Sequence, residues 1–186
     1  MGNAGLGLKR PDGDLDRVRG IMVILSALAA ATLVPALLMT LWYLHGQLSV
    51  VPSDNPYFWV DIGQFFSLCF MVIALHVVLL GGPAYALLKW RNLVRWWSGV
   101  LAGFLLAVMP IAIFTWPLRF AESGSSFSAN GVQLMVDGKP TAAGWLDFAE
   151  GILFFGIWGA LSGLVFWLVL RSGIDRFHSQ SSRIDA

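Results

Sequence analysis

One apolar segment, residues 58–88, constrains the fold of this chain more than any other feature. As a helix, its 31 residues would rise about 46 Å, well beyond the ~30 Å hydrocarbon core of a bilayer. Gly81, Gly82 and Pro83 lie near its end. Proline has no backbone N–H and clashes with the carbonyl four residues earlier, while glycines let the backbone bend. The segment therefore predicts a membrane-crossing helix that breaks at these three residues.

Three further apolar runs, at 21–44, 97–118 and 146–170, are each long enough to cross a bilayer. The first is too long for the apolar core of a cleavable signal peptide. It contains Pro35, which a membrane helix tolerates when a neighbour satisfies the freed carbonyl. Only 12% of the residues are charged, against about a quarter in soluble domains. The chain is thus predicted to be an all-α integral membrane protein, with a four-transmembrane-helix bundle over residues 21–170.

Basic residues are distributed unevenly among the segments that connect these runs. Ten of the twelve lie before the first run, between the second and third, or after the fourth: Lys9, Arg10, Arg17, Arg19, Lys89, Arg91, Arg95, Arg171, Arg176 and Arg183. The positive-inside rule places such segments in the cytoplasm. Residues 1–20 and 171–186 are therefore predicted to be cytoplasmic tails, and residues 119–145 an outer loop.

The outer loop contains a pattern typical of a β-hairpin. Residues 123–131 indicate a flexible turn, and residues 132–136 then alternate apolar and polar side chains at the period of a strand. Asp137-Gly138 is a preferred two-residue hairpin turn, and Pro140 restricts the returning strand to an edge. An isolated hairpin is marginally stable in water, so we expect it to rest on the membrane surface or on a partner.

Charged and amide side chains are expected to gather at the outer boundary. An ion pair of Arg119 with Asp61 or Glu150 would cost less than separate, partly buried charges. A second interpretation is that these residues only anchor the helices at the interface. The candidate polar cluster consists of Asp61, Gln64, Arg119, Asp147 and Glu150.

His76 is predicted to lie near the middle of the membrane, where ionisable groups are costly and suggest a function. A structural interpretation is that its neutral imidazole bonds a carbonyl or hydroxyl of a neighbouring helix. Haem or metal binding would need further ligands at this depth, and Cys69 lies about 10 Å away along the helix. Cys69 is also the sole cysteine, which excludes a dithiol redox pair. No cofactor and no metal are expected.

Glycines recur four residues apart on the third and fourth runs. Such spacing lets membrane helices approach closely, because lipid offers no hydrophobic driving force for association. We interpret these glycines as internal packing positions, with a homodimer face as the alternative. The residues concerned are Gly99, Gly103, Gly159 and Gly163.

Several local motifs support a resemblance. Gly82-Pro83, Trp96-Trp97, the stretch 141–145 and the stretch 163–167 resemble those of small four-span bacterial inner-membrane proteins of unassigned role. The resemblance implies the fold and the compartment, and it brings no activity, cofactor or catalytic residue.

The composition narrows the function classes. A net charge of +1 gives no basis for a nucleic-acid surface. The leading hypothesis is a non-enzymatic interaction protein, such as an accessory subunit or an immunity-type protector. Its partners would be the lipid bilayer and either another membrane protein or a second copy. The alternative is a small oligomeric transporter or channel, suggested by His76, the broken second helix and the outer carboxylates. A spanning carboxylate, which proton-coupled exporters need, is missing.

Overall fold

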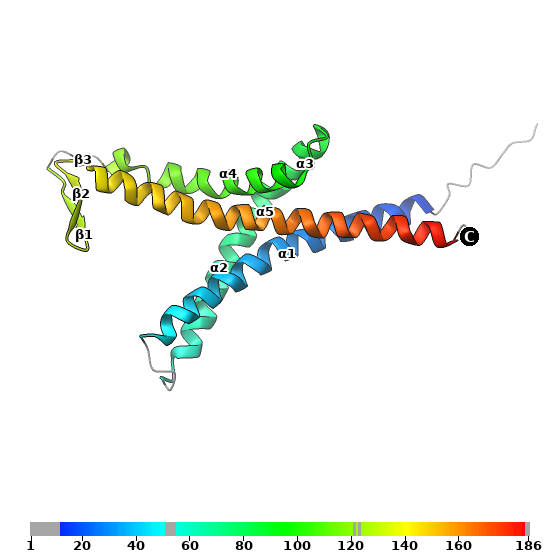
Figure 1. The fold of residues 1–186 in the computed structure, drawn as a ribbon, viewed down its shortest axis with the longest axis horizontal. Coiled ribbons are helices and arrows are strands. Elements are labelled where there is room, and N and C mark those ends of the chain that lie inside the picture. The colour runs from blue at the N-terminus through cyan, green and yellow to red at the C-terminus, as the bar shows by residue number, and fades with distance from the viewer. Residues whose placement is uncertain (1–11, 51–54, 121, 123, 185–186) are drawn as a thin grey trace, which may run out of the picture.

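The computed structural model describes residues 12–50, 55–120, 122 and 124–184 and is mostly helical (Figure 1). Its helices are α1 (Asp12–Leu48), α2 (Phe58–His76), the π-helical turn η1 (Val77–Gly81), α3 (Gly82–Trp90), α4 (Trp96–Phe114), the 3-10 turn η2 (Pro117–Phe120) and α5 (Ala142–Ile184). Four helical stretches are long and apolar enough to cross a membrane: Arg17–Leu48, Phe58–Trp90, Trp96–Arg119 and Ala142–Gly173. The prediction of four apolar helices is confirmed.

The first and last helices extend further than their apolar runs. α1 begins at Asp12 and α5 continues to Ile184, so nearly half of the first predicted tail and most of the second are helical. Hydropathy marks the residues that prefer lipid, whereas a helix continues until a residue such as proline stops it. Neither 12–20 nor 171–184 contains a proline. The remainder of the tails, 1–11 and 185–186, lies outside the described residues.

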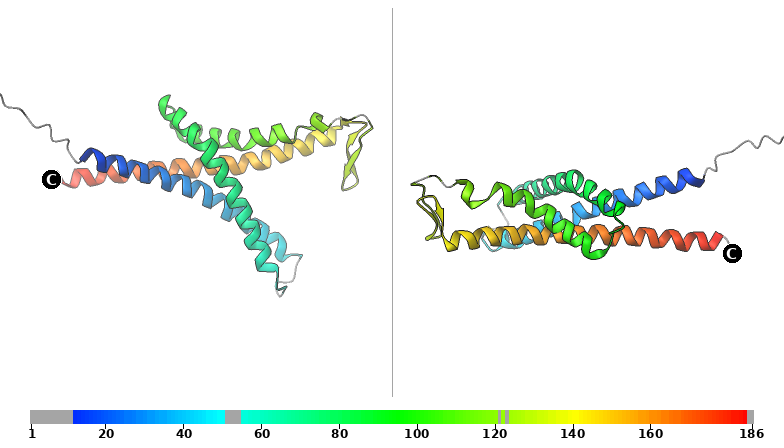
Figure 2. Two further views of the ribbon diagram at one scale, coloured as in Figure 1. Left: turned by 180° about the vertical axis from the view of Figure 1, so that it is seen from behind. Right: turned by 90° about the horizontal axis from the view of Figure 1, so that it is seen from above.

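The helices form two pairs that diverge from a common crossing. α4 packs along α5, and α1 packs along both α5 and α2. Figures 1 and 2 show the end of α1 and the start of α2 at one tip of the molecule and the strands at another. The four long helices that we predicted are present, but their ends diverge instead of forming one compact bundle. Apolar periodicity does not determine the angle at which two helices cross, which depends on the side chains at the contact.

The break in the second span is a widened helical turn. The Gly82 N–H donates to the carbonyl of Val77, five residues earlier, which is the π-helical pattern. Pro83 follows at the start of α3 and cannot donate to the preceding turn. The irregularity thus begins at Val77, one turn before the predicted break at Gly81 and Gly82.

Three short strands form an antiparallel sheet in the order β1 (Phe127–Ala129), β2 (Val132–Val136) and β3 (Lys139–Pro140). Asp137 and Gly138 have φ values of 47° and 73°, as a type I′ hairpin turn requires, so the predicted hairpin is confirmed. Asn130 and Gly131, with φ values of 51° and 77°, make a second such turn. This turn adds β1, which the sequence indicated only as flexible.

The sheet is supported by the start of α5. The Thr141 hydroxyl donates to the Gln133 carbonyl at 2.7 Å, and the Thr141 N–H donates to the Leu134 carbonyl at 3.0 Å. A Cβ at Gly144 would collide with that same Leu134 carbonyl. The hairpin that we expected to rest on the membrane surface or a partner therefore rests on its own chain, although Phe127 and Val132 remain exposed.

Candidate functional site

The four glycines meet across the α4–α5 contact. Gly99 lies opposite Gly163, and Gly103 lies opposite Gly159. A Cβ at Gly99 would come within 3.1 Å of the Gly163 carbonyl oxygen, and a Cβ at any of the other three would approach backbone atoms still more closely. Only glycine permits this backbone approach. The glycine faces are thus occupied inside the chain, which joins α4 and α5 into one unit.

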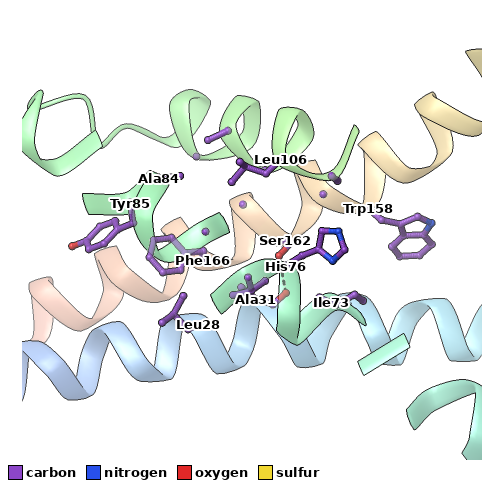
Figure 3. Close-up of a pocket in the computed structure, with 18 of the residues that line it drawn as sticks. Leu28, Ala31, Ile73, His76, Ala84, Tyr85, Leu106, Trp158, Ser162 and Phe166 are labelled. Atoms are coloured by element: carbon purple, nitrogen blue, oxygen red, sulfur yellow. Dashed lines mark hydrogen bonds between the residues drawn. The ribbon is translucent and has the colours of Figure 1, made fainter. Parts of the chain in front are cut away.

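A hydrogen bond from α5 satisfies a carbonyl that Pro35 leaves free in α1. Pro35 has no N–H, so the carbonyl of Ala31, four residues earlier, lacks its helical donor. The Ser162 hydroxyl donates to this carbonyl at 2.8 Å (Figure 3). Ala31 is 2% exposed, so the bond is shielded from solvent. The neighbour that the sequence required for Pro35 is therefore Ser162.

A cavity of about 390 Å³ lies between the two helical pairs. This volume falls within the roughly 300–1,000 Å³ of typical small-molecule sites. Its walls are almost entirely apolar and come from every long helix; they include Leu28, Ile73, Ala84, Leu106, Trp158 and Phe166 (Figure 3). Along α4 the lining residues extend from Ser98 to Ile111, about 20 Å at the rise of a helix. The cavity is therefore elongated.

His76 lines this cavity with one ring nitrogen already engaged. Nδ1 lies 2.8 Å from the Val72 carbonyl, one turn earlier in α2. A neutral imidazole in this bond carries its proton on Nδ1, which leaves Nε2 as an acceptor. Figure 3 shows the ring among the residues that surround the cavity. The bond to a neighbouring helix that we predicted is wrong, because the partner belongs to the same helix.

Other polar groups lie around the cavity. The Cys69 thiol approaches the Met39 thioether at 3.9 Å, linking α2 to α1. Tyr85 packs edge-on against Phe166, with ring centroids 5.2 Å apart. In the described part of the chain, no three His, Cys, Asp or Glu residues group closely enough to hold a metal ion.

Two arginines mark one end of the cavity. Arg95, which immediately precedes α4, is among the lining residues. The Arg171 guanidinium lies 5.2 Å from the ring centroid of Trp167, which also lines the cavity. A Cβ placed on Gly99 would be 3.5 Å from the Cβ of Trp167, so the start of α4 and the end of the apolar part of α5 are adjacent.

The candidate polar cluster is divided between two tips of the molecule. Asp61 and Gln64 belong to the first turns of α2, whereas Arg119, Asp147 and Glu150 belong to the sheet end of α4 and α5 (Figure 1). The structure therefore does not bring these five residues together, Asp61 lies far from Arg119, and anchoring of the helices at the interface stays a prediction. The Arg119 guanidinium lies over the Phe114 ring at 5.6 Å. Two residues at the same depth in a membrane can still lie far apart laterally. Here the divergence of the helices separates Asp61 from Arg119.

Sequence reasoning missed the cavity and the roles of Ser162, Tyr85 and Arg95. The role of Ser162 could have been predicted, because Ser162 is a polar residue in an apolar run and Pro35 leaves a backbone carbonyl without its helical donor. The sequence does not show which helices contact one another, so it could not predict the cavity. No family model, no curated protein and no solved structure matches this chain.

Proposed function

We propose that this chain is a multi-pass protein of the bacterial inner membrane that crosses it four times, with both termini in the cytoplasm. Support comes from the four long apolar helices and from the ten basic residues in the segments assigned to the cytoplasm. Reporter fusions at residue 186 and within residues 124–131 test this topology. Activity of both reporters on the same side would contradict it.

Within the membrane, we propose a non-enzymatic interaction role, as an accessory subunit or an immunity-type protein. This proposal is carried by an exposed polar side chain on the helix that has the smallest buried share among the four candidate spans. In the most apolar stretch of Phe58–Trp90, no residue is buried inside the protein. In the most apolar stretch of Arg17–Leu48, 28% of the residues are buried. Gln64 is exposed about 9 Å along this span, and its amide bonds no described residue.

An exposed amide at the outer boundary of the hydrocarbon keeps only part of the hydrogen bonding that water would supply. A helix of another membrane protein that presents a polar side chain would satisfy Gln64, and such bonds hold membrane helices together. The proposed partner is therefore an integral membrane protein that packs against the outer half of α2.

Site-specific photocrosslinking in native membranes tests this role. A photoreactive residue at Gln64 is expected to form an adduct with a distinct membrane protein, and one at Met109 is not. Met109 is a matched control because it is 60% exposed on α4 and carries no polar group. Only lipid adducts at position 64, or the same protein adducts at both positions, would contradict the proposal.

A second candidate function is a small oligomeric transporter or channel, favoured by the His76 Nε2 acceptor in the cavity. The two functions predict opposite mutant patterns in a phenotype assay. Loss of the signal in His76→Phe with retention in Gln64→Leu would favour transport. The reverse pattern would favour interaction.

A further inference from the structure

We propose that the cavity between the helical pairs binds an anionic phospholipid from the cytoplasmic leaflet. One acyl chain lies along the cavity, and the phosphate lies at Arg95. This inference rests on the proposed membrane topology, which places the start of α4 at the cytoplasmic side.

The distribution of apolar and charged residues along the cavity matches that of such a lipid. Its walls are apolar over about 20 Å of α4, and Ile111 and Phe155 line the end away from Arg95. Among the described residues that line the cavity, Arg95 is the one with a permanent charge. A ligand that fills the site therefore needs a long apolar body with a charged group at one end. An acyl chain with its headgroup has this form.

The charged side chains described at the arginine end are positive. Arg95 lines the cavity there, and Arg171 lies over Trp167 on the neighbouring helix. Lys89, in the last turn of α3, adds to the local positive potential. Guanidinium groups bind phosphate through paired, charge-assisted hydrogen bonds. Basic pockets between spans on the cytoplasmic side suit anionic headgroups.

Native mass spectrometry of the delipidated full chain tests the proposal, with phosphatidylglycerol and phosphatidylcholine of matched chains as probes. Wild type is expected to retain one phosphatidylglycerol with at least a tenfold preference. Arg95→Gln should reduce that preference to threefold or less. Arg91→Gln is the matched control, because Arg91 belongs to the same connection and does not line the cavity.

A second pair of variants tests the chain site. Ala84→Phe fills the cavity and should weaken binding of phosphatidylglycerol at least tenfold. Ala86→Phe, on the exposed face of the same helix, should bind like wild type. Each variant is compared only if it elutes as a single species with wild-type helicity, and Leu106→Trp replaces Ala84→Phe if that variant fails to fold.

Equal binding of the two lipids by wild type would overturn the proposal, as would unchanged binding in both Arg95→Gln and Ala84→Phe. Displacement of the lipid by soluble glycerol phosphate at millimolar concentration would also overturn it, because the site would then recognise phosphate without a chain. Release of the protein from membranes by alkaline carbonate would instead refute the proposed membrane role. The two failures are therefore distinguishable.

Discussion

Replacing Ser162 by Ala removes the only donor that the described structure gives to the Ala31 carbonyl from outside α1. Pro35 prevents α1 from supplying a donor of its own, so the carbonyl would be left unsatisfied in apolar surroundings. Interhelical hydrogen bonds in membrane proteins contribute about 0.6 kcal/mol on average and up to about 1.7 kcal/mol. Because this carbonyl has no substitute, we expect a loss near the upper value, about 1.5 kcal/mol.

The reasoning predicts a specific coupling with Pro35. Pro35→Ala restores an N–H four residues after Ala31, so the helix can satisfy its own carbonyl. In that background Ser162→Ala should cost about 0.5 kcal/mol or less. The double-mutant cycle should therefore yield a coupling free energy of about 1 kcal/mol between two residues on different helices.

Unfolding by SDS in mixed micelles, followed by tryptophan fluorescence, measures each free energy. A thermal scan should show a loss of about 3–6 °C for Ser162→Ala alone, if the scaling for soluble chains of this length holds. Ser172→Ala is the control, because the Ser172 hydroxyl bonds the Val169 carbonyl of its own helix and no other described residue. Equal costs for Ser162→Ala with and without Pro35 would refute the idea that Ser162 compensates for the proline.

The other predictions concern packing and His76. Gly159→Leu or Gly163→Leu should cost about 1–3 kcal/mol in the same assay, because the side chain would force α4 and α5 apart; Gly151→Leu, where a Cβ meets open space, should cost far less, and equal losses at all three would contradict the packing. His76→Phe should change stability by less than about 1 kcal/mol, since the backbone N–H at position 76, which belongs to α2, still donates to the Val72 carbonyl. Loss of helicity in His76→Phe, measured by circular dichroism, would contradict this prediction, because it would show that the fold depends on the imidazole.

The sequence by itself determined the local features of this protein. Four apolar runs predict four long helices because each excludes charge over the thickness of a bilayer. Asp137-Gly138 predicts its turn because both residues tolerate positive φ. The spacing of Gly99 and Gly103 predicts a close helix contact because glycine leaves the backbone uncovered. Each of these inferences depends only on residues near one another in the chain.

The tertiary structure alone decided which of these elements meet. Asp61 and Arg119 have the same expected depth, yet they lie at separate tips because the helical pairs diverge. Ser162 reaches the Ala31 carbonyl across 131 positions of the chain. The cavity is lined by residues of α1, α2, α4 and α5 that lie far apart in the sequence. Crossing angles arise from the packing of side chains between helices, and that packing follows from no local pattern in the sequence.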